Sequence, residues 1–172
     1  MGSDNVVVVA DGRDGEARRI VVAVDESEES MYALSWCLNN IVQRQPRNYC
    51  KDALVLLHAK RPTVVYPGLD SSAYLSSHDA LSSLDRRDNE MACWILQKAD
   101  KLCAEHDVKV EKKVEEGDPG DVICEMVKVL KADLLVMGSH GYSQLARAIM
   151  RSVSHHCVQN ASCPVLVVKM PK

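Results

Sequence analysis

Short apolar runs alternate along the chain with segments of helical periodicity. Residues 20–24 and 53–59 are near-continuous runs of Val, Leu, Ile and Ala, and residues 132–138 and 165–168 are similar. Short apolar runs of this kind are typical of strands buried on both faces of a parallel sheet. In residues 108–114 apolar residues alternate with charged ones, which predicts a strand with one exposed face at an edge of the sheet.

Between these runs, apolar residues recur at helical spacing. The helical segments are residues 27–42, about 81–106, 119–130 and 152–160. Ser27 can cap the first of them, and Asp118 followed by Pro119 is a clear start signal for the third. Because strands and helices alternate, we predict an α/β fold, an open five-stranded parallel sheet with helices on both faces. The expected strand order is 3-2-1-4-5.

The length of 172 residues fits one domain. Residues 1–18 contain two Gly-interrupted turns with mixed charge and are interpreted as a flexible N-terminal arm, with the domain in residues 19–172. Residues from 62 to about 80 are rich in Ser, Pro, Gly and Asp, which predicts a long loop. Loops of that length inside a compact domain are usually functional or disordered.

Composition excludes several classes of function. The net charge of −3 gives no electrostatic footprint for nucleic acid or an anionic membrane. No apolar run approaches the roughly 20 residues that a membrane span needs. The first residues contain no basic segment before an apolar one, so we expect no secretory signal. The expected location is the cytoplasm, and the nucleus stays open.

Seven cysteines without a Cys-x-x-Cys motif favour free, buried thiols in a reducing compartment. The only cluster of metal-ligand residue types is His155, His156 and Cys157. Adjacent residues of a helix do not share a face, so we predict no metal site there. No nucleophile stands beside a partner base in the sequence, so we assign no catalytic residue.

The candidate chemistry follows the first and fourth predicted strands. In open parallel sheets, ligands bind beyond the carboxyl ends of strands, where the strand order reverses. At that place the sequence has residues 23–25 and residues 137–141, which include Gly138 and Gly141. Glycines let backbone N–H groups approach an anion closely, and the helix beginning near Ser152 adds the N–H groups of its first turn. This pattern predicts a phosphate cradle, with an ordinary strand–helix turn as the alternative.

The cradle is neither a Walker A loop nor a dinucleotide fingerprint, because the Gly-Lys-Ser/Thr and Gly-x-Gly-x-x-Gly patterns are missing. It resembles the nucleotide motif of the universal stress protein family, Gly-x-x-Gly, nine residues, then Gly-Ser/Thr. Gly138, Gly141 and Ser152 match that motif, and Arg151 replaces its last glycine. The resemblance, to plant-type single-domain members, covers about residues 19–169 and includes the segments Val22–Ser27, Leu57–Ala59 and Gly117–Pro119.

The resemblance implies a Rossmann-like fold of the adenine nucleotide alpha hydrolase type and a role for each matching residue. Asp25 would bond to the adenosine, whose pocket Ala23 and Val24 would line, and Ala59 would touch adenine. The ribose and phosphate contacts would come from Met137, Gly138, Ser139, His140, Gly141, Arg151, Ser152, Val153 and Ser154. For two of these residues a purely structural alternative stays open, namely a helix-capping role for Asp25 and a solvated turn position for His140.

The implied ligands are ATP or AMP, with ADP also open, and Mg²⁺ could enter with ATP. At Arg151 a side chain could either obstruct the phosphate path or clamp a phosphate through its guanidinium group. We therefore expect nucleotide binding with an altered preference for phosphate number.

The expected function is an adenine-nucleotide-binding, stress-response regulator that acts as a homodimer. Residues Val165, Leu166, Val167 and Val168 form an apolar edge strand that would pair with its copy, as the resemblance also implies. Coverage of that edge by the N-terminal arm is the alternative. Two other functions stay open, a nucleotide-independent interaction or chaperone-like scaffold and a slow ATPase.

Overall fold

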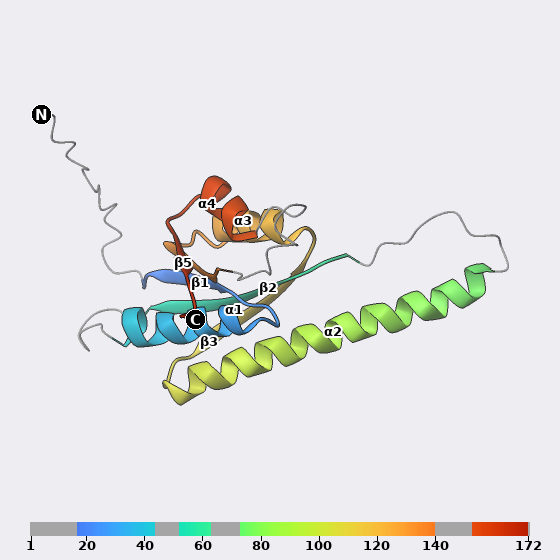
Figure 1. Ribbon diagram of the computed structural model, residues 1–172, viewed down its shortest axis with the longest axis horizontal. Coiled ribbons are helices and arrows are strands. Elements are labelled where there is room, and N and C mark those ends of the chain that lie inside the picture. The colour runs from blue at the N-terminus through green and yellow to red at the C-terminus, as the bar shows by residue number, and fades with distance from the viewer. Residues whose placement is uncertain (1–16, 44–51, 63–72, 140–152, 172) are drawn as a thin grey trace, which may run out of the picture.

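The computed structural model describes residues 17–43, 52–62, 73–139 and 153–171, with the backbone alone for residues 73–81. Its centre is one sheet of five parallel strands (Figure 1). The strands are β1 (Arg19–Ala23), β2 (Ala53–Lys60), β3 (Val110–Glu116), β4 (Leu134–Gly138) and β5 (Val165–Val168). Their order is β3-β2-β1-β4-β5, which confirms the predicted topology and places β3 and β5 at the two edges.

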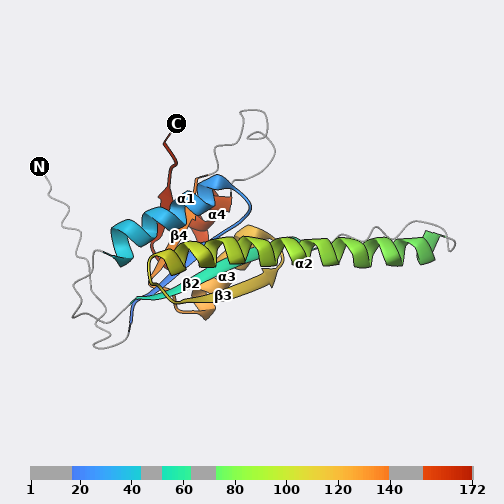
Figure 2. The same ribbon diagram turned by 90° about the horizontal axis from the view of Figure 1, so that it is seen from below.

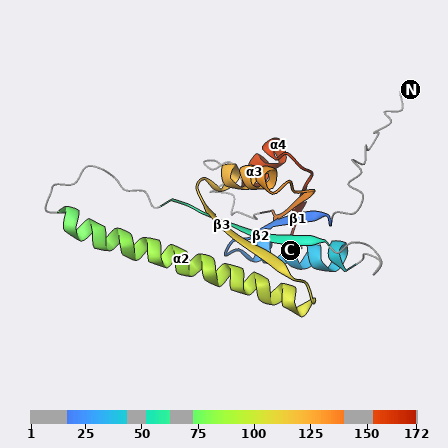
Figure 3. The same cartoon turned by 180° about the vertical axis from the view of Figure 1, so that it is seen from behind.

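Helices cover both faces of the sheet. They are α1 (Glu28–Cys37) with the short π-helical extension η1 (Leu38–Val42), α2 (Ala73–Glu105), α3 (Pro119–Val129) and α4 (Val153–Asn160). Helices α1 and α2 lie on one face, and α3 and α4 lie on the other (Figure 3). Among the described residues, no helix combines the length and apolarity that crossing a membrane requires.

The local start signals act as the sequence predicts. The Ser27 hydroxyl accepts a hydrogen bond of 3.2 Å from the Ser30 N–H at the start of α1. The Asp118 carboxylate accepts one of 3.1 Å from the Gly120 N–H, with Pro119 in the first turn of α3. Each cap satisfies an N–H group that has no partner within its own helix.

Alternation along the central strand divides the core into two apolar clusters. Ile20, Val22 and Val24 pack on the α1 and α2 side, whereas Val21 and Ala23 pack on the α3 and α4 side. Residues 20–24 are all buried. This explains why the strand is apolar throughout rather than at every second position.

Helix α2 corrects one prediction. It begins at Ala73, so the expected loop from 62 to about 80 is wrong for residues 73–80, while residues 63–72 lie outside the described part of the chain. The segment is polar but contains good helix formers such as Ala and Leu, and a helix that reaches past the sheet needs no continuous apolar face. The N-terminal part of α2 does extend beyond the sheet (Figure 2).

The last residue of the predicted arm contacts the domain. Arg18, which the sequence placed in the arm, forms an ion pair of 2.8 Å with Asp52 just before β2. Residues 1–16 of the arm lie outside the described residues.

Lys60, the last residue of β2, links the sheet to α2 through ion pairs and a hydrogen bond. Its side chain is 9% exposed, and its ammonium group lies 2.7 Å from the Asp85 carboxylate of α2 and 3.2 Å from Glu116 of β3. It also donates a hydrogen bond of 3.1 Å to the Asn89 side chain. The bond with Asp85 raises the pKa of Lys60 and lowers the pKa of Asp85.

The ion pairs of Lys60 with Asp85 and Glu116 predict that the free energy of unfolding depends on pH differently in the wild type and in Lys60→Met. Because the pKa of Asp85 is lowered in the fold, its contribution is present above the ordinary aspartate pKa of about 3.9 and is lost below it. The raised pKa of Lys60 keeps the contribution present up to the ordinary lysine pKa of about 10.4. Urea unfolding from about pH 6 to pH 2 should show wild type losing stability relative to Lys60→Met.

Lys98→Met is the matched control, because Lys98 lies over the Trp94 ring. Its stability relative to wild type should change little over the same range. If the free energies of unfolding of wild type and Lys60→Met change equally with pH, the ion pairs of Lys60 contribute nothing to stability.

Candidate functional site

The strand order reverses between β1 and β4. These strands are neighbours, with Val22 opposite Val136, whereas the chain reaches β4 only after passing through β2 and β3 on the other side of β1. The segments that leave Ala23 and Gly138 therefore emerge at one edge of the sheet and lead to opposite faces. This is where ligands bind in open parallel sheets.

The chain beyond β1 is held against β2. The Val24 N–H donates to the Leu57 carbonyl at 2.9 Å, and the Val24 carbonyl accepts from His58 Nδ1 at 2.9 Å. His58 is buried, and this bond requires the proton on Nδ1. Sequence analysis gave His58 no role, although a polar residue inside an apolar run is a signal that could have singled it out.

Asp25 takes part in the start of α1. Its carboxylate accepts hydrogen bonds from the N–H and the hydroxyl of Ser27, the N–H at 3.1 Å. The buried Ser30 hydroxyl accepts from the Asp25 N–H at 3.1 Å and lies 3.1 Å from the carbonyl oxygens of Asp25 and Ser27. These contacts support the helix-start alternative, while an adenosine contact of Asp25 stays a prediction.

Gly138 is required by packing. A Cβ at this position would lie 2.7 Å from the carbonyl group of Glu29 and 2.9 Å from the Ser30 nitrogen, so the first turn of α1 rests directly on the end of β4. The next N–H group, that of Ser139, donates to the Val168 carbonyl at 2.9 Å. The Ser139 N–H is therefore engaged within the sheet, and Gly138 has a structural reason besides anion approach.

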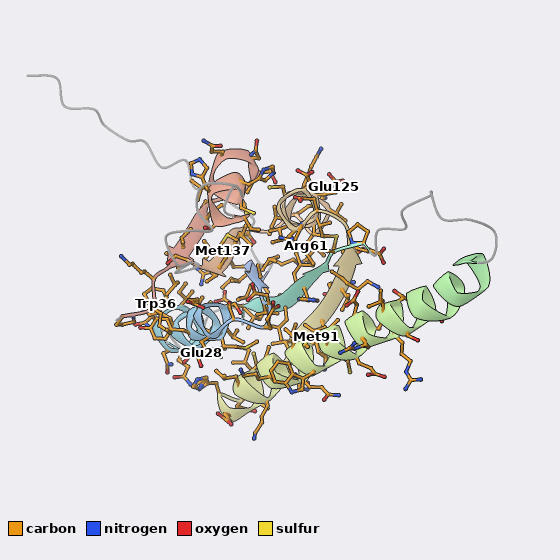
Figure 4. The ribbon with its side chains drawn as sticks, turned by 45° about the vertical axis from the view of Figure 1, so that its right-hand side comes forward. Glu28, Trp36, Arg61, Met91, Glu125 and Met137 are labelled. Carbon is orange, nitrogen blue, oxygen red and sulfur yellow. The ribbon has the colours of Figure 1, made fainter. Side chains whose placement is uncertain are left out.

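Four of the predicted site residues share one face of the sheet. Ala23, Ala59, Met137 and Val153 belong to the apolar cluster under α3 and α4, whereas Val24 points to the opposite cluster. In Figure 4, Met137 lies on the α4 side of the sheet and Glu28 on the α1 side. The structure thus places residues from three strand ends and the first position of α4 on the same apolar face.

The start of α4 is positioned by its contact with α3. A Cβ on Gly120 would meet the His156 ring at 2.9 Å, and His156 Nε2 lies 3.1 Å from the Asp121 carboxylate. Val153 and Ser154 therefore lie in the first turn of a helix packed against α3. The remaining predicted site residues lie outside the described part of the chain, namely His140, Gly141, Arg151 and Ser152.

The cysteines near this face are unsuited to nucleophilic chemistry. Burial raises the pKa of Cys157 to about 12 and also raises the pKa of Cys124 and of Cys163, so these groups are protonated at neutral pH. Cys93 is exposed, which corrects the expectation that the thiols are buried. In the described ranges, no three His, Cys, Asp or Glu side chains come together as a metal site.

Comparison with known proteins identifies the family. The family model described as the universal stress protein family matches residues 16–169, and the chain belongs to this family. A universal stress protein of Methanocaldococcus jannaschii is 32% identical over 93% of this chain and 88% of its own length. A universal stress protein A-like protein of Arabidopsis thaliana is 30% identical over 90% and 91%.

Solved structures of the family share the fold. UspA from Lactobacillus plantarum matches with a TM-score of 0.69 and 21% identity, covering 90% of this chain and 99% of its own. An Arabidopsis thaliana family member solved with AMP bound gives 0.63 and 24%, covering 90% and 92%. An Archaeoglobus fulgidus member in complex with dAMP gives 0.56 and 17%, covering 90% and 98%.

The contact between Gly138 and α1 predicts the cost of adding one methyl group. Gly138→Ala should lower the free energy of unfolding by about 1–3 kcal/mol, because the new Cβ meets backbone atoms that cannot move independently. Val129→Ile is the control, because it adds one methyl group to a side chain that is 62% exposed, so its cost should be much smaller. Denaturant unfolding measures both, and an equal or larger cost at Val129 would contradict the packing argument.

Proposed function

We propose that this protein binds an adenine nucleotide at the carboxyl ends of β1, β2 and β4. The observation that carries the proposal is that Ala23, Ala59, Met137 and Val153 belong to the apolar cluster on one face of the sheet, the first three at or next to the ends of β1, β2 and β4. Two of these side chains are single methyl groups, which suits a flat base, and small-molecule sites are mostly apolar with a few polar groups. The family members solved with AMP and with dAMP support the choice of ligand.

The phosphates would extend toward the first turn of α4. Val153 and Ser154 are the first residues of this helix, and the positive end of the helix dipole favours an anion there. His140, Gly141, Arg151 and Ser152 are proposed to complete the cradle, on the motif they share with the family. The proposed ligands are ATP or AMP, with ADP also open, and Mg²⁺ would enter with ATP, held mainly by phosphate oxygens and water.

The base site predicts that added bulk at Ala59 blocks binding. Calorimetric titration of wild type with AMP and ATP should show binding, and Ala59→Leu should weaken both affinities at least about tenfold, or about 1.4 kcal/mol. Val129→Leu is the control, because Val129 is 62% exposed at the end of α3. Circular dichroism checks that both variants fold. No binding by wild type at millimolar nucleotide, or unchanged affinity in Ala59→Leu, would refute the site.

The arginine at position 151 predicts a separate effect on the preference among AMP, ADP and ATP. Because the family motif has glycine at this position, Arg151→Gly should change the ratio of the AMP, ADP and ATP affinities while leaving adenosine affinity unchanged. An arginine that clamps a phosphate would make wild type favour the nucleotide whose phosphate it reaches. Identical affinities for all three nucleotides in both proteins would contradict a role for Arg151.

The proposed role is regulatory, with the protein acting as a homodimer in stress response. The carbonyls of Pro164 and Val168 accept hydrogen bonds from β4, so alternation turns the N–H and C=O groups of Val165 and Val167 outward. An apolar edge with outward backbone groups favours antiparallel pairing with its copy. The six described cysteines are all free thiols, which supports a reducing location such as the cytoplasm.

A further inference from the structure

His58 is a polar residue inside the buried strand β2. Its neighbours Leu57 and Ala59 belong to the apolar cluster under α3 and α4, so alternation along the strand puts the His58 ring on the opposite face, toward α1 and α2. The residue is 8% exposed, and Nδ1 lies 2.9 Å from the Val24 carbonyl oxygen. This bond satisfies the ring nitrogen, which would otherwise be costly to bury.

The hydrogen bonds between β1 and β2 stop one step before a regular ladder would. The Val24 N–H still donates to the Leu57 carbonyl at 2.9 Å, as it would in a continuing parallel pair. The next bond of such a pair would run from the Ala59 N–H to the Val24 carbonyl, because these groups are turned toward each other's strand. In the part of the chain that the structure describes this bond does not form, and strand pairing ends with Ala23 opposite Leu57.

The His58 imidazole takes the place of the missing ladder donor. Val24 is 3% exposed, and a buried carbonyl without a donor costs free energy, so the chain must supply one. Because the ring donates from the α1 and α2 face, it satisfies the Val24 carbonyl without the Ala59 N–H. The side chain of β2 thus replaces the main chain of β2 as the partner of Val24.

We propose that His58 is a positioning residue of the nucleotide site, which ends the β1–β2 ladder early and so keeps the carboxyl ends of these strands open for a ligand. The role toward a ligand rests on the proposed function, whereas the open ladder does not. Ala23 and Ala59, the last side chains of the two strands on the α3 and α4 face, line the proposed base site. Without the imidazole, the Val24 carbonyl would turn to the Ala59 N–H, and the two strands would close beside that site.

Amide hydrogen exchange of Ala59, measured by NMR on the full chain without nucleotide, tests the open ladder. Protection is taken relative to the exchange rate of the unfolded sequence, because residue 58 itself affects that rate. His58→Leu removes the donor and keeps the site apolar, so the Ala59 N–H should gain the ladder bond and its protection should rise at least about tenfold. His58→Met, which also lacks a donor, should behave alike. His58→Asn keeps a side-chain N–H at the level of Nδ1 and should stay near the wild-type value.

Calorimetric titration with AMP tests the consequence for binding. His58→Leu should weaken the AMP affinity at least about tenfold, and His58→Asn should recover most of it. Lys60→Met is the matched control, because Lys60 lies on the same strand and face while its ammonium group is paired with Asp85 and Glu116. This variant should leave both the AMP affinity and the protection of the Ala59 N–H near their wild-type values. Circular dichroism checks that every variant folds.

The two measurements separate a failure of this role from a failure of the proposed function. Unchanged or lower protection of the Ala59 N–H in both His58→Leu and His58→Met would overturn the open ladder, whatever the protein binds. Equal AMP affinities of wild type and His58→Leu, or no recovery in His58→Asn, would overturn the positioning role. Absence of AMP binding by wild type would refute the proposed function and the role of His58 toward a ligand, while the exchange result would still decide the ladder.

Discussion

The first turn of α1 packs directly against Gly138, which fixes the segment that follows β1 to the end of β4 at the site. No side chain fits between the Glu29 carbonyl and this glycine, so helix backbone rests on strand backbone. Ser27 and Ser30 then fix the turn that joins β1 to α1, through bonds to both the main chain and the carboxylate of Asp25. Together with the bonds of Val24 to Leu57 and His58, this contact fixes the chain at the end of β1, because close-packed interiors adjust little to local changes.

At this edge the two faces of the sheet carry different kinds of side chain. On the α1 side, buried polar groups tie strand ends together, as His58 does with the Val24 carbonyl. On the α3 and α4 side, the matching positions Ala23, Ala59 and Met137 are apolar and mostly small. These polar contacts therefore lie on the face opposite the proposed base site, where they can hold the strand ends in place without filling that site.

Much of this fold could be predicted from sequence because its signals are local. Buried strands are apolar along their whole length, and the caps at Ser27 and Asp118 depend on residues within one helical turn. The start of α2 was missed because a helix that leaves the sheet has no apolar face to mark it. The commitment of the Ser139 N–H to Val168 and the packing role of Gly138 were missed because both depend on contacts between segments distant in sequence.

The two edges of the sheet differ in a way that directs association. On β3, Lys112 pairs with Asp100 of α2 at 2.7 Å, and Lys113 pairs with Glu111 at 2.8 Å, so charged side chains line this edge strand. On β5 all four residues are aliphatic. Charges on an edge strand oppose the addition of another strand, whereas an aliphatic edge permits it. Strand addition is thus disfavoured at β3 and permitted at β5, so the two edges of one sheet differ in the contacts they allow.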